Sequence, residues 1–163
     1  MDVALVLSKR STCVKAAVGC VLTDARGRIL ATGYNGVAHG QPHCNEPCGD
    51  IPNPKLEGRK AEHWEIARVA VYPHACPGHD LPPGSESCQA VHAEVNALMQ
   101  CRDVDAIDTV YCTAEPCFRC TKELLNTGAR RIVWERAYGP EPQAGALWQK
   151  AGREWQQIGG KNA

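Results

Sequence analysis

Two short motifs restrict what this chain can fold into more than any other feature of its sequence. One places His92 in "AVHAEVNAL", and the other, "PCFRC", makes a Cys-x-x-Cys pair of Cys117 and Cys120. Both stand where a helix is expected to begin, and a helix N-terminus lowers the pKa of a thiol. One imidazole and two thiolates make three zinc ligands and leave a fourth position open, which is typical of catalytic zinc. The fold should therefore bring two helix starts together.

Glu94 follows His92 by two residues in a run that otherwise reads as apolar helix. A buried, unpaired carboxylate is costly, so Glu94 faces either water on an ordinary helix or a metal and a substrate. Zinc lowers the pKa of its bound water toward ~7, and a neighbouring carboxylate that is not a ligand can accept the proton. His-x-Glu followed by Pro-Cys-x-x-Cys is the signature of zinc nucleobase deaminases.

Two simpler interpretations compete with a catalytic site. A redox Cys-x-x-Cys pair does not explain the His-x-Glu motif. A structural zinc beside a surface glutamate does not explain the missing fourth ligand. The combined pattern therefore favours catalysis.

Length and charge exclude several classes of protein. The 163 residues fit one domain, and 18 basic residues balance 18 acidic ones. This balance argues against a broad nucleic-acid surface, although a small anionic ligand needs only one or two local cations. The short apolar run before Lys9 and Arg10 does not resemble a signal peptide, and no stretch approaches the ~20 apolar residues of a membrane span. We expect a soluble cytoplasmic protein whose ten cysteines serve metals or catalysis rather than disulfides.

Residue periodicity predicts helices that alternate with strands. Helices are expected over residues 1–9, 91–101, 117–126 and 143–151, and strands over residues 17–23, 29–34, 109–113, 131–135 and 155–158. Asp24 to Gly27 should form a hairpin turn, and Gly128 should end the third helix. The alternation indicates an α/β sheet with some parallel pairing. Packing roles are expected for Cys20, Cys101, Cys112, Leu147, Trp148, Ala151 and Trp155.

Residues 37–88 differ from the rest because they are rich in proline, histidine and cysteine, and only residues 59–71 look weakly helical. A loop of this length is unusual in a compact domain unless it is functional or tied down. We therefore expect a single domain, residues 1–163, with an insertion at about residues 37–88.

Several segments together resemble the deoxycytidylate (dCMP) deaminases of the cytidine deaminase-like group, including relatives from phages and bacterial competence operons. They are "RSTC" with "VGCVLT", "TGYNG", "GQPHC", "HAEVNAL", "AEPCFRC" and "AYGPEP". The resemblance implies a three-layer α/β/α fold with a five-stranded mixed sheet. It also implies a hydrolase that converts dCMP to dUMP and ammonia for thymidylate synthesis, with Glu94 carrying protons to N3 and the departing amine.

The resemblance also assigns substrate contacts. Asn35 would lie against the sugar, the backbone of Ala93 would face the pyrimidine edge, and Glu115 would belong to the same site. The cations nearest in sequence to hold the phosphate are Arg10, Lys15 and Arg119, which the sequence does not rank. Without the resemblance, "YNG" could equally be an ordinary turn.

A second, structural zinc could tie down the insertion, since structural zinc contributes folding energy directly. The resemblance adds Cys13 to the cysteines of the insertion, so four of five are expected as ligands: Cys13, Cys44, Cys48, Cys76 and Cys88. His43, His74 and His79 are possible substitutes. The alternative is a set of free thiols and solvent-facing histidines.

Regulation is implied by the same resemblance. Family members are commonly homo-hexamers that are activated by dCTP and inhibited by dTTP, with Mg²⁺ on the triphosphate. The effector segment would comprise Tyr34, Asn35 and Gly36, where Gly36 supplies backbone freedom. The alternative is an unregulated enzyme.

Other functions remain as rivals. A nucleic-acid-editing deaminase is disfavoured by the neutral charge and the lack of a basic aromatic stripe. Deaminases of free cytidine, guanine or a riboflavin precursor share the zinc motif but are disfavoured by "GYNG" and the cysteine-rich insertion. The sequence leaves open a 5-modified dCMP as the preferred substrate.

Overall fold

The chain is described here by a computed structural model, which covers residues 1–13, 15–40, 43, 89–137 and 142–159. Most of the insertion lies outside these residues. The expected helix at 59–71 and the candidate zinc ligands Cys44, Cys48, Cys76, Cys88, His74 and His79 therefore lie outside the described part of the chain.

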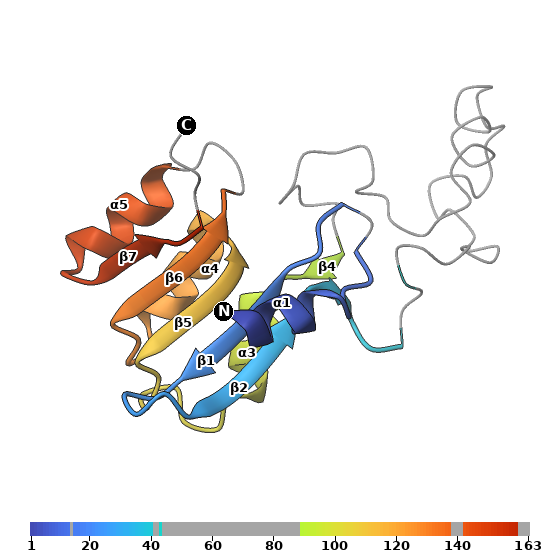
Figure 1. Ribbon diagram of the computed structural model, residues 1–163, viewed down its shortest axis with the longest axis horizontal. Helices are drawn as coiled ribbons and strands as arrows, with labels where there is room; N and C mark the ends of the chain where they lie inside the picture. The colour runs from blue at the N-terminus through green and yellow to red at the C-terminus, as the bar shows by residue number, and fades with distance from the viewer. Residues whose placement is uncertain (14, 41–42, 44–88, 138–141, 160–163) are drawn as a thin grey trace, which may run out of the picture.

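A five-stranded mixed sheet forms the centre of the molecule, in the order β2-β1-β5-β6-β7 (Figure 1). The strands are β1 Gly19–Thr23, β2 Ile29–Tyr34, β5 Thr109–Ala114, β6 Arg131–Arg136 and β7 Glu154–Gln157. β1 pairs antiparallel with β2 and β5, whereas β5, β6 and β7 run parallel. The mixed sheet and the parallel pairing in the second half confirm the expected fold class.

Helices cover both faces of this sheet. They are α1 Asp2–Ser8, α3 Ala93–Gln100, α4 Phe118–Leu125 and α5 Pro142–Lys150. Two glycines show how the first two are placed: a Cβ on Gly19 would collide with the backbone of α1, and one on Gly33 with the backbone of α3. Gly33 pairs with Cys20, the neighbour of Gly19, so the two glycines point to opposite faces. α1 and α3 therefore lie on opposite sides of the sheet, as the three-layer fold requires (Figure 1).

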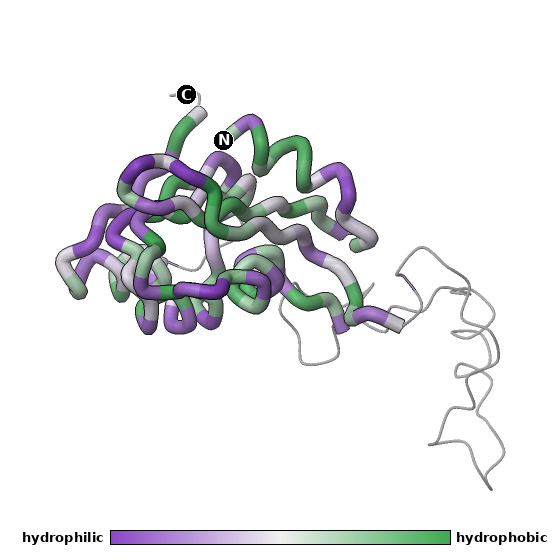
Figure 2. The backbone as a smooth tube through the Cα atoms, turned by 90° about the horizontal axis from the view of Figure 1, so that it is seen from below, coloured by the Kyte–Doolittle hydropathy of each residue, from purple (hydrophilic) through white to green (hydrophobic). Residues whose placement is uncertain are grey.

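The core lies between the sheet and the layer that contains α3. Its fully buried side chains include Leu22, Val110, Leu124, Ile132 and Trp148. In Figure 2, apolar and polar stretches alternate along the described part of the chain. Leu124 of α4 and Trp148 of α5 thus anchor both helices on the sheet.

Most packing predictions are confirmed, with exceptions. Cys20 and Cys112 lie opposite each other on β1 and β5 and are fully buried. Cys101 is only partly buried, and its thiol donates a hydrogen bond to the carbonyl of Asp103. Trp148 is a core residue, whereas Ala151 is exposed just beyond the end of α5.

Two local expectations were wrong. The helix expected from residue 91 begins at Ala93, because Ala90–Val91 forms a short strand, β4, that pairs with β3, Gly36–Val37. Gly128 does not end α4, which stops at Leu125 and is capped by Asn126. A glycine is needed at 128 because a Cβ there would collide with a backbone carbonyl. The hairpin turn at Asp24 is confirmed by the hydrogen bond from the Gly27 amide to the Asp24 carbonyl.

No helix within the described residues is long and apolar enough to cross a bilayer.

Candidate active site

The two sequence motifs meet at the N-termini of α3 and α4. His92 is the N-cap residue of α3, and Cys117 is the N-cap residue of α4. The Cys117 thiol accepts a hydrogen bond from the backbone N–H of Cys120, as an N-cap side chain does. Helix capping therefore fixes the sulfur of Cys117 at the helix start, where the dipole favours a thiolate.

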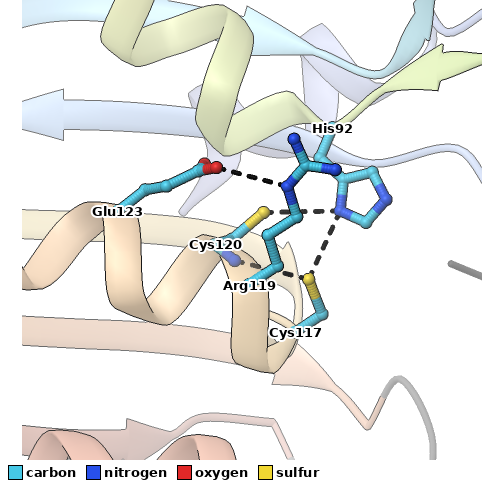
Figure 3. Close-up of polar contacts among 5 residues, drawn as sticks. All are labelled: His92, Cys117, Arg119, Cys120 and Glu123. Carbon is cyan, nitrogen blue, oxygen red and sulfur yellow. Dashed lines mark hydrogen bonds and ion pairs between the residues drawn. The ribbon is translucent and has the colours of Figure 1, made fainter.

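The three side chains form a compact donor group. His92 Nδ1 lies 3.5 Å from Cys117 Sγ and 3.4 Å from Cys120 Sγ (Figure 3). All three donor atoms lie within 4.8 Å of one another. In a tetrahedral site with Zn–S of about 2.3 Å and Zn–N of about 2.0 Å, a sulfur and a nitrogen ligand lie about 3.5 Å apart. The two nitrogen–sulfur distances therefore fit a tetrahedral zinc ion.

The protonation of the two thiols also suits a cation. The hydrogen bond from Cys120 lowers the pKa of Cys117 to about 4, and the same bond raises the pKa of Cys120 far above its usual range. The hydrogen bond with Cys117 raises the pKa of His92. The lowered pKa of Cys117 favours a thiolate, and a divalent metal ion would displace the proton of Cys120 on binding.

Glu94 is buried beside this group. It stands in the first turn of α3 and is only 4% exposed, so the alternative of a surface glutamate is wrong. Burial raises its pKa from 4.5 to about 7, although the charge of His92 opposes the shift. A carboxyl with a pKa near neutral can both accept and release a proton at physiological pH.

A cavity of about 280 Å³ opens onto these residues. The predicted site residues that line it are His92, Ala93, Glu94, Cys117, Asn35 and Glu115. Cys120 is fully buried and does not line the cavity. Cys13 does line it, whereas the other cysteines proposed for the second zinc lie outside the described residues. The structure thus gathers the predicted catalytic and substrate residues in one place.

Asn35 lines the cavity through a side chain that also organises the neighbouring loop. Its Oδ1 accepts hydrogen bonds from Ser11 Oγ at 2.6 Å and from the Val18 amide at 2.8 Å. Its Nδ2 donates to the Ala16 carbonyl at 2.7 Å, which leaves one N–H. The interpretation of "YNG" as an ordinary turn is wrong, because Asn35 links β2 directly to β3.

Tyr34 and Gly36 line a different cavity, of about 510 Å³, together with Thr12, His43 and Asn96. Successive residues of an extended chain point to opposite sides, so Asn35 faces one cavity and its two neighbours face the other. Gly36 does not have a positive φ, so backbone freedom does not explain why a glycine stands at this position. A Cβ at position 36 would instead crowd the Thr12 hydroxyl at 2.5 Å.

The cations at the active-site cavity differ from those expected. Of the three candidates, Lys15 lines the cavity, whereas Arg10 and Arg119 do not. Arg119 instead pairs with Glu123 on the surface of α4 (Figure 3). The sequence interpretation missed Arg136, which ends β6 and lines the cavity. The available signal was its place at the carboxyl end of a parallel strand, where ligands bind in open α/β sheets.

Comparison with known proteins places this site in a family. The family model for the cytidine and deoxycytidylate deaminase zinc-binding region matches residues 1–136. Deoxycytidylate deaminase of Mycobacterium phage D29 is 33% identical over 138 residues, covering 83% of this chain and 91% of the phage protein. Deoxycytidylate deaminase of Schizosaccharomyces pombe is 31% identical over 160 residues, but the chain spans only 42% of the yeast protein's length.

A solved structure shares the fold. The dCMP deaminase of cyanophage S-TIM5, in complex with dCMP and dUMP, superposes with a TM-score of 0.63 at 21% identity, covering 96% of this chain and 92% of that one. The matched region of the family model includes His92, Glu94 and both cysteines of the donor group. The chain belongs to the cytidine and deoxycytidylate deaminase family.

Proposed function

We propose that this chain is a zinc-dependent hydrolase that converts dCMP and water to dUMP and ammonia, and so supplies dUMP for thymidylate synthesis. The observation that carries the proposal is the group of His92, Cys117 and Cys120 beside the buried Glu94 in one cavity. The names of the phage and yeast relatives support dCMP as the substrate.

Each residue then has a role. His92, Cys117 and Cys120 would hold the zinc ion, which when bound supplies activated water at neutral pH. Glu94 would take a proton from the attacking water, deliver one to ring N3 and then one to the departing amine. Its pKa of about 7 suits it to both directions of transfer.

Substrate recognition would come from the cavity wall. The remaining N–H of Asn35 would bind the sugar, and the backbone of the buried Ala93 and the Glu115 segment would border the pyrimidine. The cavity of about 280 Å³ is lined by only a few charged groups, as expected for a small polar ligand.

A substrate panel tests this proposal. Purified protein is incubated with dCMP, 5-methyl-dCMP, dCTP, deoxycytidine and CMP, and ammonia release is measured. We expect dCMP to have the highest kcat/KM. Preference for another cytosine nucleotide or for the 5-methyl compound would correct the substrate, and no release from any of them would refute a deaminase.

Regulation and assembly belong to the same proposal. We infer that the chain forms a homo-oligomer, with a hexamer as the expected size. We also infer that dCTP and dTTP, with Mg²⁺ on the triphosphate, control it through the segment Tyr34–Asn35–Gly36. The position of this segment supports the inference, because Asn35 lines the active-site cavity while Tyr34 and Gly36 line the second one. A ligand in the second cavity could therefore change the substrate site directly.

A further inference from the structure

Asn96 is a polar residue of the segment "HAEVNAL" to which the proposed mechanism gives no role. It stands one helical turn after His92 in α3, and its backbone N–H donates to the His92 carbonyl at 3.0 Å. It lines the second cavity and not the active-site cavity, so its side chain is not placed to touch a ligand beside Glu94. Any part that Asn96 plays in the reaction must therefore act through another residue.

The side chain of Asn96 binds the backbone at the end of β2, which is an edge strand of the sheet. Its Nδ2 donates to the carbonyl of Tyr34, the last residue of β2, at 2.8 Å. The N–H of the same peptide belongs to Asn35 and donates to the Val18 carbonyl, on the side of β1, at 3.2 Å. The carbonyl and the N–H of a trans peptide point in opposite directions. The Tyr34 carbonyl therefore points away from β1, and Asn96 supplies the partner that a backbone group needs.

The peptide between Tyr34 and Asn35 is thus held from two sides. On one side, this peptide and the carboxamide of Asn35 bind the segment that leads into β1. On the other side, Asn96 joins the peptide to α3, the helix that carries Glu94 and begins at His92. The bond from Asn96 therefore links the wall of the active-site cavity that Asn35 forms to the helix of the reacting groups.

We propose that Asn96 is a positioning residue that sets the distance between Asn35 and the reacting groups on α3; this rests on the proposed function. The sugar of dCMP has one free hydroxyl, at the 3′ carbon, because the 5′ oxygen carries the phosphate. With the Asn96 bond in place, the remaining N–H of Asn35 meets this hydroxyl while the pyrimidine lies beside Glu94. Without the bond, the end of β2 shifts, whereas α3 stays anchored by the fully buried Ala93 and Ala97.

The test compares two substrates that differ only in the 3′ hydroxyl. KM and kcat are measured for dCMP and for 2′,3′-dideoxy-CMP with wild-type protein, Asn96→Ala and Asn96→Gln. Asn96→Ala should raise the KM for dCMP by ~10-fold and leave kcat almost unchanged, because a misplaced Asn35 weakens ground-state and transition-state binding alike. The KM for 2′,3′-dideoxy-CMP should change far less, since this substrate lacks the hydroxyl that Asn35 binds. Asn96→Gln keeps a donor amide and should recover part of the loss.

Met99→Ala is the matched control, since Met99 lies on the same helix, is 78% exposed and lines neither cavity. It should leave both KM values unchanged, and the zinc content of every variant should equal that of wild type. Equal increases in KM for the two substrates, a loss of kcat or zinc, or no effect of Asn96→Ala would overturn the inference while the proposed function stands. Wild-type protein that does not deaminate dCMP would instead refute the proposed function and this inference with it.

Discussion

At the scale of single residues, Glu94 places a titratable group where folding alone would favour an apolar one. Its carboxyl is almost fully buried beside three metal-ligand candidates, and burial raises its pKa to about 7. Burial of such a group lowers the stability of the folded chain, and active-site residues commonly do so because the reaction needs them.

The cost of burying Glu94 should depend on pH. Below pH 4.5 the carboxyl is protonated in both the folded and the unfolded chain, so its burial carries no ionisation penalty. Between pH 4.5 and about 7 the unfolded chain ionises first, and the free energy of unfolding falls by up to about 3 kcal/mol. After treatment with a chelator, Glu94→Gln should match wild type at pH 4 and exceed it at pH 8. Urea unfolding at both pH values measures this, and a pH-independent difference would contradict it.

At the scale of elements, the site depends on how closely α3 approaches β2. Gly33 allows this approach, because a Cβ there would collide with the backbone of Ala93 and Ala97. The same helix begins at His92 and carries Glu94 in its first turn. The packing of α3 on the sheet therefore sets the position of both residues.

We expect Gly33→Ala to displace α3. Overpacking should lower the free energy of unfolding by about 1–3 kcal/mol, and a shift of the catalytic residues by about 1 Å should lower kcat/KM by ~100-fold. Gly27→Ala is the control, since Gly27 has a positive φ in a turn where an added Cβ has no neighbours. That variant should lose stability but keep its kcat/KM. Normal activity in Gly33→Ala would show that α3 does not set the site.

The elements near the site were predictable because their signals are local. The strand Ile29–Tyr34 was predicted with its observed bounds, since the turn at Asp24 and the apolar run both lie nearby in sequence. The pairing of Gly36–Val37 with Ala90–Val91 was missed because it joins segments on either side of the insertion. Arg136 was missed although its place at the end of a parallel strand was an available signal, because its contacts with the carbonyls of Thr113 and Ala17 join segments far apart in the sequence. The residue patterns did not predict the strand order, because it depends on contacts between segments far apart in the sequence.

At the scale of the whole molecule, two proposals reach beyond the catalytic cavity. One is a second zinc that ties down the insertion, for which Cys13 and the possible substitute His43 are the candidate ligands within the described residues. The other is control by nucleotides at the cavity of Tyr34 and Gly36.

The second zinc predicts a metal stoichiometry. Metal analysis of purified protein should give about two zinc ions per chain, since structural and catalytic zinc both bind tightly through thiolates. Cys13→Ala should lower the value toward one. A firm value of one in wild-type protein would remove the second site.

Regulation predicts the shape of the dCMP saturation curve. An effector must bind one conformational state better than another, typically by ~1–3 kcal/mol. The curve should be sigmoidal alone, hyperbolic with dCTP and Mg²⁺, and suppressed by dTTP. Identical hyperbolic curves under all three conditions would leave the second cavity with a structural role only.

The central claim is that Glu94 transfers protons beside a zinc ion held by His92, Cys117 and Cys120. It is tested most directly by measuring dCMP turnover and zinc content in Glu94→Gln, with His92→Ala as the metal-loss variant and Glu135→Gln, a half-buried carboxylate outside the cavity, as the control. Glu94→Gln should keep its zinc and lose at least ~100-fold in kcat, because an amide cannot carry the proton. His92→Ala should lose the metal, and Glu135→Gln should retain both metal and turnover. A zinc-loaded Glu94→Gln protein with near-normal turnover of dCMP would contradict the account.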